Sequence, residues 1–364
     1  MRTHPDIRQS MQALPAWLQP MLTWLTGKPL PGQAPLITWN PWTRLIPNVF
    51  KLGLGLAMAA WILTLPTWAW LLLPIAWLLA SGGFRGLYLE LAHAAVHHAF
   101  AKTKKVNQIV TEALTTISLT PGYHEFRGEH VSSHHGATAT IADPDYAALV
   151  SFGFTPGLSE VELRRRAAWS WLNPTLHARY LWSRLRGNFA RGPWYRRLLA
   201  VAWHGGILAT VAATDSWMWF GVAYLVPLTW GYQMSSVLQM LAGEHRWNQD
   251  VGKGRERLHS LTYGRMLGEA FPTAGGFVAK STWWLRLLTY HVPAKLMVFV
   301  GNDIGPAHDL HHRKPHSDWS NAAFTRQQMI DDGTFGPHED VWGSLGVHIA
   351  YSLRGMASGS RSTS

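Results

Sequence analysis

The sequence predicts an all-α integral membrane protein. We expect two transmembrane helical hairpins, with about four membrane helices, and a cytoplasmic helical cap that carries a histidine-rich metal site. Long uncharged runs occur in pairs along the chain, which is rare in soluble folds. The chain has 19 His among 364 residues, and many of them lie near the ends of these runs. It has no Cys, which excludes a thiolate metal site and a thiol nucleophile.

The parts of the chain outside the hairpins differ in composition. Residues 1–44 are expected to form an N-terminal cytoplasmic segment, because "MRTHPDIRQS" has no apolar core and no cleavage site of a secretory signal peptide. Residues 45–350 would form the membrane domain. Residues 351–364 are expected to be a disordered tail, since "GMASGSRSTS" offers little to pack.

The first hairpin is predicted at about residues 45–91. Leu52–Phe84 contains no acidic or basic residue. This run is too long for one crossing, which takes about 20 apolar residues, and short for two. Extending it across Lys51 and Arg85 gives two full helices, with the turn near Pro66 in "TLPTW".

The second hairpin is predicted at about residues 198–243. Only Asp215 separates the uncharged runs Leu198–Thr214 and Ser216–Gly243, so "ATDSW" is expected to be the turn. Tryptophans stand near both turns, where an aromatic belt would lie at the membrane surface. They are Trp68, Trp70, Trp217 and Trp219.

Charge predicts the orientation and the partners. The turns at 65–67 and 212–217 contain no Lys or Arg, whereas residues 85–197 and the C-terminal region are rich in them. The positive-inside rule therefore places both termini and the histidines in the cytoplasm, at what we expect to be a bacterial cytoplasmic (inner) membrane. Segment 160–203 mixes Arg with Trp and Leu, as interfacial helices do. The net charge of +11 suits an anionic membrane, and no nucleic-acid module is present, so we expect no nucleic-acid partner.

Histidines form three clusters, "HAAVHH", "HVSSHH" and "HDLHH", and a lone one in "GEHRW" follows the last apolar run. Residues four apart share one helix face, and His93/His97, His130/His134 and His308/His312 have this spacing. Neutral imidazole suits Fe, Zn, Cu and Ni. The candidate ligands are too many for one ion and suit two. They are His93, His97, His130, His134, His135, His245, His308, His311 and His312.

Acidic residues beside these clusters are candidates to accept the other ring N–H of a metal-binding histidine. They are Glu90, Glu129, Glu244 and Asp309. For each of them a solvated acid is the alternative. The role of His98 stays open. The isolated histidines are interpreted as ordinary surface or core residues: His124, His204, His259, His291, His316, His338 and His348.

The three histidine clusters, called boxes below, are framed by two membrane hairpins over about residues 45–350. This pattern resembles that of the membrane fatty acid desaturase and alkane hydroxylase superfamily. The resemblance implies two non-haem irons held by the eight histidines of the boxes, and His245 matches the family's lone histidine. It also implies O2 as co-substrate and a lipid or apolar acyl chain as substrate. Electrons would come from a separate redox protein of ferredoxin or rubredoxin type and its reductase, because no fused redox domain is visible.

The motifs point to more than one subfamily of this superfamily. Ala94 stands where desaturases often have Asp and alkane hydroxylases Glu, and Arg246 and Trp247 replace the hydroxylases' Tyr-Gly. "EHVSSHHG" with its downstream "DPD" is more similar to a hydroxylase, whereas two hairpins are more similar to a desaturase. We therefore expect an acyl-lipid desaturase first and a fatty acid or alkane hydroxylase second. A third hypothesis is a metal-binding membrane protein without catalysis, although the helices carry few ionisable groups to line an ion path.

Overall fold

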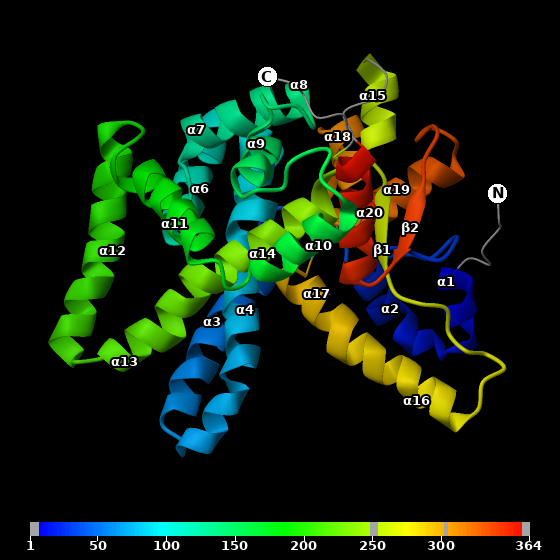
Figure 1. Cartoon of the computed structure of the whole chain (residues 1–364), viewed down its shortest axis with the longest axis horizontal. Helices are drawn as coiled ribbons and strands as arrows, with labels where there is room; N and C mark the ends of the chain where they lie inside the picture. Colours follow the sequence, from blue (N-terminus) through cyan, green and yellow to red (C-terminus); the bar gives the residue numbers. More distant parts are fainter. Residues whose placement is uncertain (1–6, 248–253, 302–304, 359–364) are drawn as a thin grey trace.

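The structure is a computed structural model that describes residues 7–247, 254–301 and 305–358. Helices make up most of it, and several helical arms extend from a cap (Figure 1). Among the described residues, three helices are long and apolar enough to cross a membrane: Leu45–Leu63, Thr67–Val96 and Trp194–Thr214.

The first hairpin follows the prediction. Helix α3 (Leu45–Leu63) ends just before Pro66, and the returning arm begins at Thr67. Small residues allow the two arms to pack closely, since a Cβ on Gly55 would lie 2.4 Å from the backbone nitrogen of Ala80. The returning arm is one continuous helix of four pieces: η3 (Thr67–Leu72), α4 (Leu73–Gly86), the π-helical η4 (Leu87–Ala92) and α5 (His93–Val96).

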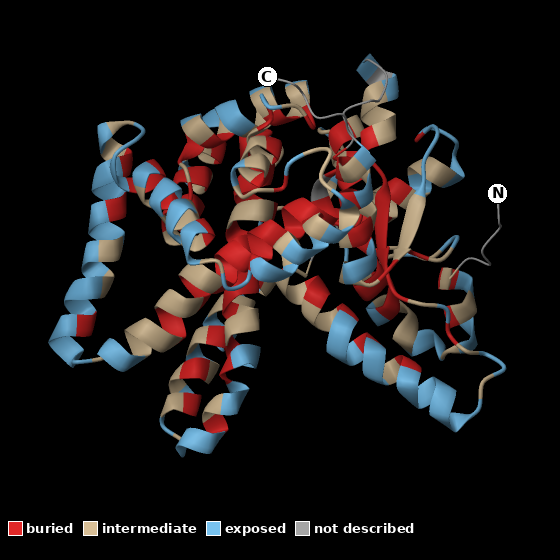
Figure 2. Ribbon diagram, viewed as in Figure 1, coloured by how far each residue is buried: buried red, intermediate tan, exposed pale blue. Residues whose placement is uncertain are grey.

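The second hairpin has two unlike arms. Helix α12 (Trp194–Thr214) ends at Asp215, which adopts the left-handed conformation with φ 51°, so the turn lies where "ATDSW" predicts it. The returning arm is helical from Trp217 to Glu244 but is not among the three membrane-length helices. Residues 231–243 are buried within the protein, and Figure 2 shows this part of α14 in the centre of the fold. Its pieces are α13 (Trp217–Trp219), η6 (Phe220–Leu225), η7 (Pro227–Gly231), α14 (Tyr232–Gln239) and η8 (Met240–Glu244).

A further arm was not anticipated from the sequence. Helix α16 (Phe277–Arg286) continues through η9 (Leu287–His291) into α17 (Val292–Met297) and slants away from the cap (Figure 1). Much of α16 is exposed in Figure 2. Its large apolar side chains Phe277 and Val278 are 85% and 77% exposed. This exposure is typical of a helix that contacts lipid.

The cap contains the remaining helices and one small sheet. Strands β1 (Gly264–Leu267) and β2 (Asp340–Gly343) pair in parallel, with Gly264 opposite Asp340, so the all-α prediction is wrong at this point. The other helices are α1 (Ile7–Ser10), η1 (Met11–Ala13), η2 (Ala16–Leu18), α2 (Gln19–Thr26), α6 (Lys104–Ile117), α7 (Tyr123–Arg127), η5 (Gly128–His134), α8 (His135–Ala137), α9 (Pro144–Ser151), α10 (Glu160–Trp169), α11 (Pro174–Phe189), α15 (Gly254–Leu261), α18 (His308–Arg313), η10 (Trp319–Asn321), α19 (Ala322–Asp331) and α20 (Leu345–Ser358).

The C-terminal segment is more ordered than predicted. Helix α20 continues from residue 351 to Ser358, where disorder was expected. Its Leu353 and Met356 are fully buried in a cluster that also contains Leu163 of α10, and this packing stabilises the helix. Residues 359–364 lie outside the described part of the chain.

Candidate metal centre

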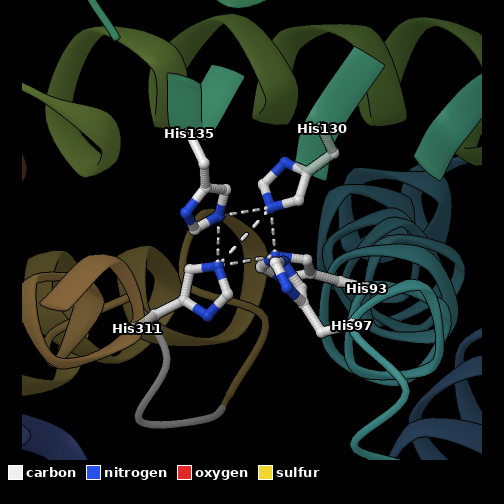
Figure 3. Close-up of side chains that lie close together, drawn as sticks. All are labelled: His93, His97, His130, His135 and His311. Carbon is white, nitrogen blue, oxygen red and sulfur yellow. Dashed lines mark hydrogen bonds between the residues drawn. The ribbon is translucent and has the colours of Figure 1, made fainter. Parts of the chain in front are cut away.

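All nine histidines proposed as ligands from the sequence lie together in the cap. Their ring nitrogens form two groups, and within each group the nitrogens lie within 4.8 Å of one another. The five-histidine group contains His93, His97, His130, His135 and His311 (Figure 3). The four-histidine group contains His134, His245, His308 and His312.

The first cluster lies at the end of the returning arm of the first hairpin. His93 begins α5, directly after the π-helical turn η4, and its Nδ1 lies 3.1 Å from the carbonyl oxygen of Leu89. His97 is the residue directly after α5. It joins the same group as His93, as the i,i+4 spacing of the two residues predicts. His98 adopts φ 60°, and its Nε2 meets the Tyr123 hydroxyl at 2.7 Å. His98 therefore belongs to neither group.

The second cluster divides between the groups, and here the spacing argument is wrong. His130 and His134 were expected to serve one point, but His130 joins the five-histidine group and His134 the four-histidine group. The reason is that η5 is π-helical, so residues five apart, rather than four, come into line. Nε2 of His135 accordingly lies 3.2 Å from Nε2 of His130.

The third cluster is divided in a complementary way. Helix α18 has α-helical geometry, and Nε2 of His308 lies 3.0 Å from Nε2 of His312, both in the four-histidine group. His311 points to the five-histidine group, where its Nε2 lies 2.9 Å from that of His135. In the second and third clusters alike, the first and last histidines belong to one group and the middle histidine belongs to the other.

Several of the nitrogen separations fit metal ions, whereas Nε2 of His93 and Nε2 of His130, which are 2.6 Å apart, lie closer than two ligands at right angles. A first-row ion binds imidazole at about 2.0–2.1 Å, so two ligands of one ion lie about 3.0 Å apart at right angles and about 3.4 Å apart at the tetrahedral angle. Nε2 of His311 lies 3.0 Å from that of His93 and 3.4 Å from that of His130. In the other group, Nε2 of His245 lies 3.2 Å from that of His134.

The protonation state also suits metal binding. Burial, and then the neighbouring histidines, lower the pKa of His130, His245, His311 and His312 well below its usual value. These rings are therefore neutral, which is the form that binds a metal. Nε2 of His97 is buried and has no hydrogen-bond partner among the described residues, so its lone pair is available within the group.

An aspartate that the sequence analysis did not propose holds one of the rings. Oδ1 of the fully buried Asp143 lies 2.8 Å from Nδ1 of His134, and this contact leaves Nε2 facing the group. Asp145 is a more distant second acid, at 3.5 Å. The sequence contained a signal for the position of this aspartate. The motif "DPD" is typical of a helix start, and Asp143 does cap helix α9.

The four acids that were proposed have different surroundings, and the side chain of one of them is not described. Glu90 accepts a 2.6 Å hydrogen bond from Asn48 and pairs with Arg44, and Asp309 pairs with Arg326 at 2.7 Å. Glu129 lines the cavity beside His130. The side chain of Glu244 lies outside the described part of the structure.

Both histidine groups border one cavity of about 100 Å³. His93 and His130 of the five-histidine group and His134 and His308 of the four-histidine group line it. A molecule in this cavity would therefore reach both groups. None of the isolated histidines in the described residues joins either group.

No family model matches the chain. It is 31% identical over 106 residues to the sn-1 oleoyl-lipid 12-desaturase of Anabaena variabilis. The aligned stretch covers 29% of this chain and 27% of that protein. This similarity and the histidine groups fit the desaturase superfamily and support an oxidoreductase at the level of class.

Proposed function

We propose that the protein is an O2-dependent membrane di-iron oxidase, and specifically a desaturase of the acyl chains of membrane lipids. The observation that carries this proposal is the pair of adjacent groups, of five and four imidazoles, that border one cavity. Nine neutral nitrogen ligands suit two ions, and imidazole is a good ligand for iron. The partial similarity to a lipid desaturase supports the substrate class.

The reaction explains why a metal is needed. An unactivated C–H bond resists acids, bases and nucleophiles, and iron bound by the two groups would supply the reductive activation of O2 that overcomes this resistance. In a desaturation, O2 takes two electrons and two protons from the acyl chain, and two electrons from a donor with two protons from water. The products are an alkene and two waters.

The residues of the chain have holding and orienting roles in this reaction. The Leu89 carbonyl and the Asp143 carboxylate fix the rings of His93 and His134, so that Nε2 of each faces its group. Burial of the groups keeps bulk water away from the reacting carbon. Because the chain has no Cys, we propose a separate ferredoxin- or rubredoxin-type donor with its reductase.

The proposed location is the bacterial cytoplasmic (inner) membrane, with the histidine groups on the cytoplasmic side. The three apolar helices support membrane insertion. The basic residues of the cap and the uncharged turns support the orientation.

Metal analysis of the purified chain tests the centre. We expect about two irons per chain and less zinc, as nine imidazoles in two groups suggest. One tightly held zinc with no iron would contradict the proposal.

A hydroxylase is the second candidate, and one observation favours it. The cavity beside the histidines is partly polar, because Arg85, Ser236 and Gln239 line it together with Met240. Lipid analysis of expressing cells under 18O2 separates the candidates. A new double bond without label indicates desaturation, and a labelled hydroxyl indicates hydroxylation. If the protein binds iron but forms no O2-dependent product, it is a metal-binding protein without catalysis.

A further inference from the structure

A second, larger cavity is lined by none of the nine histidines. It has a volume of about 590 Å³ and lies between η2 and α2, the first turns of α3, and the end of α17. Arg44 immediately precedes α3, which is one of the three membrane-length helices. The cavity is therefore at the level where this helix would enter the bilayer, which is the level of the lipid head groups.

The walls of the cavity are apolar and open. Trp17 is 76% exposed, Leu36 78% and Phe50 65%, although all three are large apolar side chains. Exposed apolar residues gathered around a hollow indicate an apolar partner. Trp in such a position is typical of the membrane–water interface.

The same cavity also has polar lining residues, here called its floor, which include the buried Arg44, Asn48 and Glu90 and the half-buried Lys51. Arg44 donates to the carbonyl oxygen of Ser320 and lies 3.5 Å from Glu90, which also accepts from Asn48. Lys51 donates to the carbonyl oxygen of Val300. The charged residues that line the cavity are thus two cations and one carboxylate, which leaves the described floor net positive.

We propose that this cavity binds an anionic phospholipid of the bilayer. The phosphate would meet Arg44 and Lys51, and the acyl chain would follow Phe50 and Leu296 toward the membrane. A guanidinium and an ammonium are the groups that proteins use to bind phosphate. The apolar walls match the other half of the molecule. Binding at this site does not rest on the proposed oxidation.

Native mass spectrometry of the purified full chain in detergent tests this proposal. The protein is mixed with phosphatidylglycerol or phosphatidylcholine of the same chain length, and the fraction that carries one lipid is measured. We expect a preference for phosphatidylglycerol. Lys51→Gln should reduce its binding about fivefold, as the attraction between one Lys and anionic lipid suggests, whereas Lys51→Arg should retain it.

A matched control is Lys280→Gln on α16, because Lys280 is an exposed cation outside the cavity. It should leave phosphatidylglycerol binding unchanged. Equal binding of the two lipids, an equal loss in Lys280→Gln, or displacement of the phospholipid by equimolar oleate would overturn the proposal. Iron content, measured on the same samples, reports separately on the histidine centre and on the folding of each variant.

Discussion

At the scale of single residues, the two histidine groups differ in what holds their rings. His134 of the four-histidine group faces a buried carboxylate, whereas His93 of the five-histidine group faces a backbone carbonyl. A carboxylate partner makes the opposite ring nitrogen a stronger donor to a metal. The four-histidine group has fewer ligands, and Asp143 strengthens one of them.

Replacement of a single ligand tests each group separately. We expect His311→Ala, in the five-histidine group, and His134→Ala, in the four-histidine group, to abolish turnover. The proteins should stay in the membrane, because apolar burial inserts the helices. Membrane fractionation and a product assay measure both properties. His338→Ala is the control, since His338 is exposed and belongs to neither group. Full activity in both ligand variants would remove the metal centre from the mechanism.

The carboxylate behind His134 gives a finer test. Asp143→Asn keeps the shape and an acceptor oxygen but removes the charge, so we expect iron affinity to fall about 10–100-fold. Iron titration should show weakening of one of the two ions, because Asp143 contacts only the four-histidine group among the described histidines. Asp145→Asn is the matched control, with its longer 3.5 Å contact and partial exposure. Equal loss of both ions would show a general effect on folding.

At the scale of elements, the π-helical turn η5 decides which histidine serves which group. "HVSSHH" has one residue more between its histidines than "HDLHH". A π turn takes up one extra residue, so His130 and His135 occupy the positions that residues four apart hold in α18. The spacing of the clusters predicted that these histidines lie together. It did not show their division, because the spacing argument assumes α-helical turns.

Deletion of Ser132 tests this explanation. Ser132 is exposed, and its removal gives the second cluster the spacing of the third. An α-helical turn would then bring His130 and His135 together, so we expect both irons to be retained. Insertion of one Ala after Ser132 should cost at least one iron, because no regular turn takes up two extra residues. Metal analysis of both variants measures this, and loss of iron in the deletion variant alone would refute it.

At the scale of the whole molecule, the apolar runs predicted the first helical hairpin and the positions of both turns, and the structure shows Asp215 at the second turn in the left-handed conformation. Two features were missed, the first because charges interrupt its hydropathy pattern and the second because tertiary packing determines it. Lys280 and Arg286 interrupt the apolar pattern of α16, although the helix exposes a large apolar surface. The end of α20 looks disordered by composition but is held by the burial of Leu353 and Met356.

The last prediction concerns orientation, which joins the hairpins to the histidine centre. The turns near Thr67 and Asp215 contain no Lys or Arg, and Trp68 and Trp217 are exposed beside them. The cap carries most of the described basic residues and all nine histidines, so we expect it to face the cytoplasm. A reporter inserted at Thr67 or at Asp215 should be periplasmic, and one fused after residue 364 cytoplasmic. Paired alkaline phosphatase and green fluorescent protein fusions distinguish the two sides. If the Thr67 and C-terminal reporters lay on one side, the first hairpin would not span the bilayer, and the cap could not stand at its surface as proposed.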